Sequence, residues 1–362
     1  MIVFTKSILV DFNSHLDASI SNVVIFGTDN DLLKGFINEF YNGIRTIKET
    51  SLFYIPDGED SKGLEVVNDL WMKLVDSKAN RSTLIVAIGG GATLDVVAFC
   101  SFTFMRGLNF WSIPTTLLAM VDAAIGGKNG INFSGYKNLI GSFYNPNRIW
   151  ICIDFIKTLS QIELKNGWAE CLKHALIEGK DLWKEIQAVN WSLTDESLHT
   201  YWYNLVRRNA LYKDQITKQD FYDNGLREVL NAGHTFAHAL ESFHFARNES
   251  ISHGKAVAWG LLFESLVGNE MSFEEFEKLP KNHWLKVVEE LVTSNYSPLP
   301  TYSFSNFEEV MFYAFKDKKN RTGTIKASVI CSPGVFRLHQ EIDFHKIFDW
   351  IQKYRLTQIR KT

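Results

Sequence analysis

One stretch of the chain, an apolar run followed by three glycines, constrains the fold more than any other. Residues 84–88 (LIVAI) are apolar and rich in β-branched side chains, as in a strand buried on both faces. Gly89, Gly90 and Gly91 follow, and then an apolar stretch, 92–105, that is long enough for a buried helix. Such a turn places backbone N–H groups where an anionic ligand can approach. The spacing differs from the G-x-G-x-x-G dinucleotide fingerprint, so a tight turn without a ligand is the alternative.

A second glycine-rich segment favours the ligand interpretation. A short apolar run, 110–113, ends in a proline and two threonines, and the sequence Gly126-Gly127-Lys128 follows. Two glycine-rich turns with lysines nearby indicate two anionic groups to bind, a dinucleotide and a charged substrate. Asp95, one turn into the first helix, either accepts a hydrogen bond from a ribose hydroxyl or favours the positive end of the helix dipole.

The order of the other elements predicts two domains. In residues 1–155, apolar strands alternate with helical stretches, which is typical of a parallel sheet with crossover helices. Helical periods dominate 156–362, including one continuous helix expected over 225–245, and a small hairpin is expected near 327–331. The predicted fold class is therefore an α/β Rossmann-like parallel-sheet domain that binds NAD, followed by an all-α domain that binds metal and substrate.

Composition narrows the classes of partner. The formal net charge is -3 and the pI is about 6.4, so no global basic field points to nucleic acid or an acidic membrane. The four cysteines are scattered without a C-x-x-C pair, which suits reduced thiols in a cytosolic protein. Neither a signal peptide nor a membrane span is recognised in the sequence. We expect a cytoplasmic protein with a small-molecule substrate and no nucleic-acid or membrane partner.

A group of histidines and one glutamate could carry metal chemistry. His234 and His238 are spaced i, i+4 on one helical face, and His253 stands at an expected helix start. Glu170, with Lys173 one turn later, offers a carboxylate on an otherwise apolar face. Two histidines and a carboxylate form an open site for a catalytic divalent metal such as zinc. The spacing alone leaves open the alternative of an ordinary polar helix face and a buried histidine in the core.

Taken in order, the motifs resemble those of the dehydroquinate synthases, within the sugar phosphate cyclases. The resemblance extends from residue 56 to residue 319. The motifs that carry it are Pro56-Asp57-Gly58-Glu59 with Lys62, Gly89-Gly90-Gly91 with Asp95, Met105-Arg106-Gly107, Pro114 to Ala119, Val121-Asp122, Gly126-Gly127-Lys128, Lys137 to Gly141, Lys157-Thr158-Leu159, Ala169-Glu170 with Lys173, Leu230-Asn231, Gly233-His234-Thr235 with His238, His253-Gly254, and Asp317-Lys318-Lys319.

The resemblance implies an enzyme that binds NAD and one divalent metal, zinc or cobalt. The implied metal ligands are Glu170, His234 and His253. The residues implied to surround NAD are Glu59, Lys62, Gly90, Gly91, Asp95, Thr115, Thr116, Lys137 and Thr158.

The resemblance also implies a substrate site. The residues implied to bind the substrate phosphate are Arg106, Lys128, Asn138, Asn231, His238 and Lys318 or Lys319. Arg106 would come from a neighbouring subunit, which implies a homodimer. The implied catalytic residues are Asp122, Lys128, Lys173, Lys213, Arg227, Asn231 and His238. Among them, Arg227 and Lys213 match positions at the substrate carboxylate, Asp122, Lys173 and Lys213 match positions near its hydroxyls, and His238 is the candidate proton relay.

The implied activity is the shikimate-pathway conversion of 3-deoxy-D-arabino-heptulosonate 7-phosphate to 3-dehydroquinate and phosphate. NAD is reduced and reoxidised within each turnover, phosphate is eliminated, and an intramolecular aldol step closes the ring. Asn129 departs from the usual threonine, which keeps a sibling cyclase that forms an inosose or a valiolone as an alternative. Further alternatives are a metal-dependent alcohol dehydrogenase of the glycerol type and a non-catalytic binding protein. Smaller departures occur at residues 92–94, Gly63 and Lys255.

Overall fold

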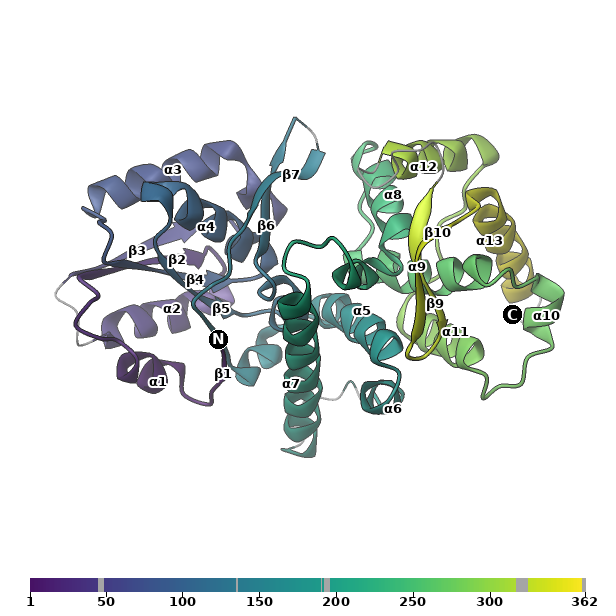
Figure 1. The fold of residues 1–362 in the computed structure, drawn as a ribbon, viewed down its shortest axis with the longest axis horizontal. Coiled ribbons are helices and arrows are strands. Elements are labelled where there is room, and N and C mark those ends of the chain that lie inside the picture. The colour runs from purple at the N-terminus through teal and green to yellow at the C-terminus, as the bar shows by residue number, and fades with distance from the viewer. Residues whose placement is uncertain (45–48, 135, 190, 192–195, 317–324, 360–362) are drawn as a thin grey trace. The chain divides into compact units, whose positions relative to one another are not determined.

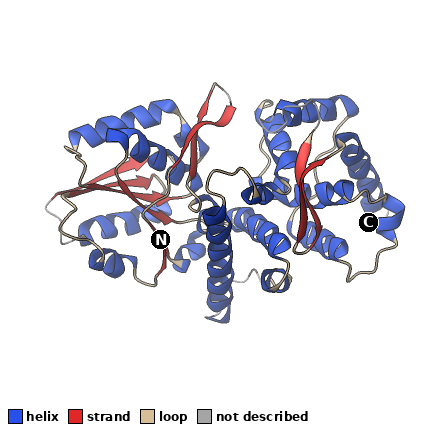
Figure 2. Ribbon diagram, viewed as in Figure 1, coloured by secondary structure: helices blue, strands red, loops and turns tan. Residues whose placement is uncertain are grey.

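The computed structural model describes the chain except for residues 45–48, 135, 190, 192–195, 317–324 and 360–362, and it contains two compact units (Figure 1). Unit 1 comprises Met1–Gly167 and Ser192–Tyr222, and unit 2 comprises Trp168–Trp191 and Asp223–Thr362. Colouring by secondary structure shows a strand-rich first unit and a second unit made mainly of helices (Figure 2).

Unit 1 is built on a six-stranded parallel sheet with the strand order β1-β8-β5-β4-β2-β3. Every residue of β2 and of β4 is buried, as expected for strands covered on both faces. The predicted parallel α/β sheet is thereby confirmed. The strands are β1 (Ile2–Phe4), β2 (Asn22–Thr28), β3 (Glu49–Ile55), β4 (Thr83–Gly89), β5 (Asn109–Pro114) and β8 (Arg148–Ile151).

Helices connect the strands of this sheet. Asn30 caps helix α2, because its side chain accepts the Leu32 N–H at 3.0 Å. The helices of unit 1 are α1 (Ile8–Ser14), α2 (Asp31–Gly43), α3 (Leu64–Asp76), α4 (Gly91–Thr103) and α7 (Glu196–Gln219), with short 3₁₀ or π turns η1 (Glu59–Lys62), η2 (Phe104–Arg106), η3 (Ala119–Ala123) and η4 (Ile153–Thr158).

An antiparallel hairpin, β6 (Lys128–Phe133) and β7 (Tyr136–Phe143), occupies the segment that the sequence suggested only as a glycine-rich turn. Gly141 allows its two strands to approach, since a Cβ there would lie 2.3 Å from the Asn129 carbonyl oxygen. The strands are half exposed and rich in polar residues, so they lack the apolar signal of a buried strand.

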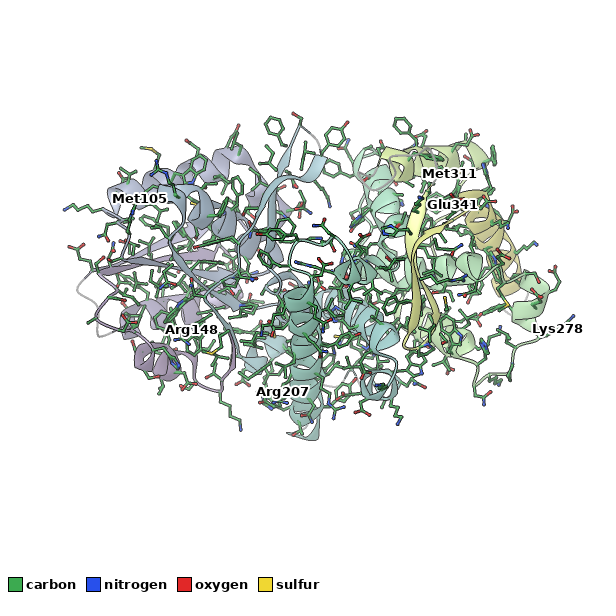
Figure 3. All side chains as sticks on the ribbon, viewed as in Figure 1. Met105, Arg148, Arg207, Lys278, Met311 and Glu341 are labelled. Carbon is green, nitrogen blue, oxygen red and sulfur yellow. The ribbon has the colours of Figure 1, made fainter. Side chains whose placement is uncertain are left out.

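The division between the units differs from the boundary expected at 155/156. The first break follows Gly167, within helix α5 (Gln161–Glu178), and α7 returns to unit 1. Contacts to β1 of unit 1 accompany this return: the rings of Tyr203 and Phe4 lie 6.2 Å apart, and the guanidinium of Arg207, which Figure 3 labels, lies over the Phe4 ring. Helical periodicity reveals that a helix exists but carries no information on which unit it packs against.

Unit 2 is mainly helical, and the hairpin expected near 327–331 is present as β9 (Lys326–Ser332) and β10 (Val335–Glu341), which pair antiparallel. The single helix expected over 225–245 is instead the short turn η5 (Leu226–Asn231) and helix α8, separated at Gly233 by a left-handed φ of 76°. Besides α5, the helices are α6 (Asp181–Ile186), α8 (His234–Phe245), α9 (His253–Gly268), α10 (Phe273–Glu277), α11 (Trp284–Asn295), α12 (Phe304–Lys316) and α13 (Phe344–Ile359).

Helix α9 forms the centre of unit 2. From Gly254 to Gly268 almost every residue is buried, and Trp259 stacks on Phe263 with ring centroids 5.4 Å apart. A helix buried on all sides lacks a polar face, which accounts for the predominance of apolar residues in its sequence. Nevertheless, none of the described helices combines the length and apolar character that a membrane span requires.

Replacing Gly179 by alanine is expected to destabilise unit 2. Gly179 has a φ of 74°, and a Cβ there would lie 2.1 Å from the Gly334 backbone nitrogen, at the turn of the β9–β10 hairpin. We expect Gly179→Ala to lower the free energy of unfolding by at least about 3 kcal/mol in urea denaturation. The matched control is Gly35→Ala in α2, where a Cβ meets nothing within 4 Å; it should stabilise by up to about 1 kcal/mol. Equal midpoints for the two variants would contradict this packing.

Candidate functional site

In unit 2 the structure brings the three predicted metal ligands together. Glu170 lies on α5, and His234 and His253 are the first residues of α8 and α9. The Nε2 atoms of the two histidines lie 3.3 Å and 2.9 Å from the same atom, Oε1 of Glu170. One potential ligand atom from each residue lies within 4.8 Å of the other two. Two imidazoles and one carboxylate thus converge on one point.

The Nδ1 atoms of His234 and His253 each lie close to an oxygen acceptor. Nδ1 of His234 lies 3.1 Å from the Ala232 carbonyl oxygen, and Nδ1 of His253 lies 3.1 Å from Oε1 of Glu241. Both Nδ1 atoms therefore act as donors, which leaves each Nε2 directed at Glu170. Outer acceptors of this kind fix the tautomer and ring orientation of metal-binding histidines. Sequence reasoning missed Glu241, although it stands two turns after His234 on one helical face.

The spacing of these atoms suits a tetrahedral cation. Bonds of about 2.0–2.1 Å from zinc to nitrogen and oxygen would place neighbouring ligand atoms roughly 3.3 Å apart. The two distances from Nε2 to Oε1, 3.3 Å and 2.9 Å, are close to this value. Two histidines and one glutamate are also a ligand set of catalytic zinc sites that keep a position open for substrate. The residues present therefore fit a divalent metal.

The electrostatics of the cluster follow from complete burial. Lys173, one turn after Glu170 on α5, forms an ion pair with its Oε2, and both side chains are buried. Burial favours the neutral acid, but the Lys173 ammonium, with the hydrogen bond from His253, outweighs it and holds the pKa of Glu170 well below its usual value. Burial lowers the pKa of His234, whereas hydrogen bonds to Glu170 and Glu241 outweigh burial and raise the pKa of His253. Glu170 is thus a carboxylate and His234 is neutral, as metal binding requires.

The other predicted site residues of unit 2 lie on nearby elements. His238 is exposed, with its ring centroid 5.3 Å from that of His234. Arg227 and Asn231 both belong to η5, where Arg227 is buried and the Asn231 amide donates to the Glu228 carbonyl oxygen at 3.1 Å. Lys318 and Lys319 lie outside the described residues.

In unit 1 the glycine turn between β4 and α4 is a place of close approach. A Cβ on Gly90 would lie 3.2 Å from the Thr116 side chain, and a Cβ on Gly91 would lie 3.1 Å from that of Ala123. Neither Gly90 nor Gly91 has a positive φ, so the need is for space rather than for a left-handed backbone. The turn opens α4 with bare N–H groups, because Gly90 is the N-cap and has no side chain.

A polar network beside this turn joins four predicted residues. The Lys62 ammonium lies 2.6 Å from the Asp95 carboxylate and also donates to the side-chain oxygen of Asn138. Asn132 connects Glu59 to Asn138, since its amide donates to Glu59 at 2.8 Å and its oxygen accepts the Asn138 N–H at 2.9 Å. Burial raises the pKa of Asp95, and Lys62 partly offsets this. Asn132 was not predicted, because a side chain that orients other residues has no sequence motif.

A second pair of predicted residues meets at η3. Nζ of Lys213, on α7, lies 2.8 Å from the Asp122 carboxylate and donates to the Asp122 carbonyl oxygen at 2.7 Å. Lys128 is exposed at the start of β6 and, together with Asp95, lines a cavity of about 20 Å³. Unit 1 therefore places these predicted cationic and acidic groups around the glycine turn and η3.

The remaining predicted residues of unit 1 are more dispersed. Arg106 is exposed and follows Met105, which Figure 3 labels. The φ values of Arg106 and Met105 are 68° and 50°. Thr115 is buried after β5, Thr158 donates to the Phe155 carbonyl oxygen at 2.7 Å, and Lys137 is exposed on β7. None of these positions tests the role that the resemblance implies, and the roles stay predictions.

Asn129, the main departure from the family pattern, has a structural task in the hairpin. Its buried amide donates to the carbonyl oxygens of Gly127 at 3.0 Å and Tyr144 at 3.2 Å, and its oxygen accepts from Ser142. These bonds support the turn that carries Lys128. These hydrogen bonds within the hairpin explain an asparagine at this position, so Asn129 by itself does not indicate a different substrate.

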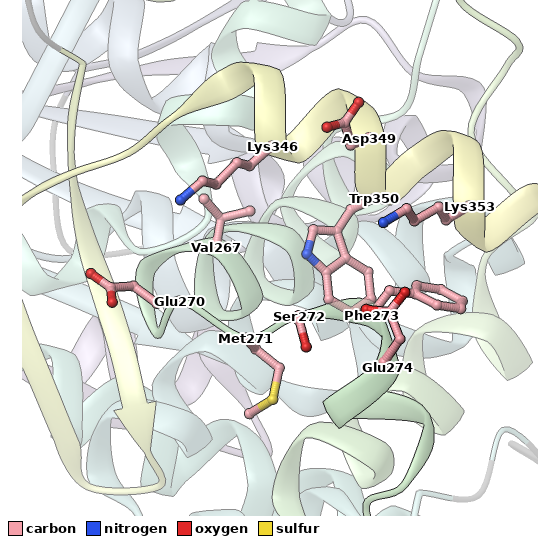
Figure 4. A pocket seen from close by; sticks show the side chains of 10 residues that line it. All are labelled: Val267, Glu270, Met271, Ser272, Phe273, Glu274, Lys346, Asp349, Trp350 and Lys353. Carbon is pink, nitrogen blue, oxygen red and sulfur yellow. The ribbon is translucent and has the colours of Figure 1, made fainter.

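A larger cavity lies elsewhere in unit 2, between the end of α9, α10 and α13 (Figure 4). Its volume is about 210 Å³, and Val267, Met271 and Trp350 contribute apolar surface to it. None of the described residues that line it belongs to the predicted site. Chemistry is expected at the histidine cluster and not in this cavity.

Comparison with known proteins identifies the family. The family models described as 3-dehydroquinate synthase N-terminal and 3-dehydroquinate synthase C-terminal match residues 52–166 and 167–320. The chain belongs to the 3-dehydroquinate synthase family. The two models meet next to the break that follows Gly167 in the structure. The matches confirm the predicted family and, with it, the prediction of a cyclising lyase.

Relatives in sequence and structure agree. The 3-dehydroquinate synthase of Parabacteroides distasonis is 33% identical over 313 residues, 86% of each chain. The structure of 2-epi-5-epi-valiolone synthase from Streptomyces hygroscopicus with NAD+ and Zn2+ has a TM-score of 0.81 at 22% identity, covering 100% of this chain and 97% of that one. That of 2-deoxy-scyllo-inosose synthase complexed with carbaglucose-6-phosphate, NAD+ and Co2+ has a TM-score of 0.79 at 20% identity, covering 97% and 96%. These structural matches confirm the fold class.

Zinc binding to the metal-free protein should release a proton from His253. Its raised pKa means that His253 keeps a proton at about pH 8, where an ordinary histidine has lost it. A bound cation needs the neutral ring, so we expect release of at least about one proton per zinc. Release from this group should decline as the pH rises through the raised pKa. Calorimetry in buffers of different ionisation enthalpy measures it, and Glu241→Gln should reduce it; zero release in the unaltered protein would contradict the prediction.

Proposed function

We propose that this chain converts 3-deoxy-D-arabino-heptulosonate 7-phosphate to 3-dehydroquinate and phosphate, with NAD and one divalent metal. Family membership supports the reaction, and the convergence of His234 and His253 on one oxygen of Glu170 is the observation that carries the metal part. The atoms balance as one substrate giving one carbocycle and one phosphate. NAD is regenerated, so no net reduction accompanies turnover.

The metal would be held by Glu170, His234 and His253, and the dinucleotide by the glycine turn and the Lys62 network. Bound there, the metal lowers the free energy needed to ionise a substrate hydroxyl, and NAD accepts and returns a hydride. Lys173 keeps Glu170 ionised, because its ammonium forms an ion pair with the buried carboxylate. Glu241 and the Ala232 carbonyl hold the imidazoles in the orientation that binding needs.

The substrate's anionic groups would be bound by the predicted cationic residues. Arg227 offers a planar guanidinium for the carboxylate, and we assign Lys128, Asn138 and Asn231 to the phosphate, as the family resemblance implies. His238, exposed beside the His234 ring, would relay protons to and from the substrate. We assign to Asp122 and Lys213 the orientation of substrate hydroxyls, since their mutual ion pair fixes both side chains.

The assembly and its compartment are part of the proposal. An exposed Arg106 on a strained turn suits an arginine that reaches a neighbouring subunit, which supports a homodimer. Cys100, Cys152, Cys171 and Cys331 are all free thiols, which supports a reducing compartment such as the cytoplasm.

Purified protein with NAD and zinc or cobalt should release inorganic phosphate from the heptulosonate substrate. NADH, followed by its absorbance in the same cuvette, should not accumulate. An alcohol dehydrogenase of the glycerol type would instead accumulate NADH. Sedoheptulose 7-phosphate and glucose 6-phosphate, assayed in parallel, test the sibling cyclases. Release from either of these and none from the heptulosonate would reject the proposed substrate.

Removal of one metal ligand gives the matched test at the residue level. We expect His253→Gln to lower kcat at least about 100-fold and to abolish stoichiometric zinc binding, because two ligands hold the metal weakly. The control is His345→Gln, an exposed histidine on α13 that stacks on Phe304. It should retain full activity and zinc content. Full zinc content in His253→Gln would exclude His253 as a ligand.

A further inference from the structure

Helix α8 begins at the metal cluster without a cap of its own. Gly233 is the N-cap and has no side chain, so it cannot accept hydrogen bonds from the first-turn N–H groups. His234 is the next residue and the first of the helix. The position of His234 therefore depends on which group accepts hydrogen bonds from the N–H groups at the start of α8.

The acceptor comes from the neighbouring helix. Glu264, on α9, is 1% exposed, and its Oε2 accepts the Gly233 N–H at 2.9 Å while its Oε1 accepts the Phe236 N–H at 2.7 Å. The two oxygens of one carboxylate thus hold N–H groups on both sides of His234. A carboxylate at a helix N-terminus is also favoured by the helix dipole, and hydrogen bonds to an ionised acceptor are stronger than neutral ones.

Close backbone contact makes this arrangement rigid. A Cβ on Gly260 would lie 2.1 Å from the Gly233 carbonyl oxygen, and a Cβ on Gly233 would lie 2.8 Å from the Leu261 backbone nitrogen. The start of α8 therefore rests directly on α9 within one turn of Glu264. Because His253 is the first residue of α9, the same helix carries one metal ligand and the cap of the other.

We propose that Glu264 is a positioning residue of the metal site: its carboxylate fixes the first turn of α8 and thereby aims Nε2 of His234 at the cation. The inference rests on the proposed function, since it requires a metal at Glu170, His234 and His253. A buried carboxylate is costly unless its bonds are made, and here they are made to the backbone of a ligand-bearing turn.

The test is Glu264→Gln, which keeps the size of the side chain. An amide has one acceptor oxygen and one NH₂ group, so one of the two N–H groups would face a donor and the turn would shift. We expect zinc affinity, measured by competition with a chromophoric chelator, to fall about tenfold or more. The visible absorption bands of the cobalt-loaded protein should also change, because they report ligand geometry, which a uniform loss of stability does not alter.

The matched control is Glu275→Gln on α10. Glu275 also accepts a backbone N–H at a helix start, that of Ser272 at 2.9 Å, but it belongs to a capping box on another helix. It should leave zinc affinity and the cobalt spectrum unchanged. If Glu264→Gln does not fold, Glu264→Asp replaces it, and the shorter reach should change affinity and spectrum in the same direction.

The outcomes separate the two proposals. Failure of the unaltered protein to bind zinc or cobalt overturns the proposed metal site itself. Metal binding by the unaltered protein, with the same affinity and spectrum in the Glu264 variant, overturns the positioning role and leaves the proposed function standing. Weaker binding with a changed spectrum in the Glu264 variant alone supports the positioning role.

Discussion

The structure of unit 2 depends on one buried carboxylate, that of Glu170. A fully buried charge is destabilising unless it is paired and hydrogen-bonded. Lys173 supplies the pairing from the same helix, and the Nε2 atoms of His234 and His253 face the other oxygen. Two helices begin at these histidines, so the starts of α8 and α9 are fixed around a single atom. The contacts that compensate the charge of Glu170 are therefore also the contacts that hold the three predicted metal ligands together.

In unit 1, small residues at the turn between β4 and α4 allow the backbone to pack closely. At Gly90 and Gly91 the backbone lies against the side chains of Thr116 and Ala123, and α4 begins without a side-chain cap. The Lys62–Asp95 ion pair stands beside this turn and keeps a cation and an anion within hydrogen-bonding reach of each other. In both units, closely packed backbone thus stands beside charged side chains that ion pairs and hydrogen bonds hold in place.

The parallel sheet was predictable because buried strands such as β2 and β4 are continuous apolar runs. The β6–β7 hairpin was not, because its strands are half exposed and rich in polar residues. The metal ligands were predicted from the family resemblance, while their spacing alone left two interpretations open. Glu241 and Asn132 escaped prediction because each acts through a partner distant in sequence. The break at Gly233 escaped it because a glycine within a helical pattern is ambiguous.

The return of α7 to unit 1 has a consequence for how the protein can be divided. Trp202, Leu205, Val206 and Ala210 on this helix are buried, so α7 covers apolar surface that the first 155 residues do not cover themselves. A fragment ending at residue 155 would leave that surface in contact with water, and it would lack Lys213, the partner of Asp122. Unit 1 is thus discontinuous in sequence, and during synthesis it can be completed only after residues 168–191 of unit 2 have been made.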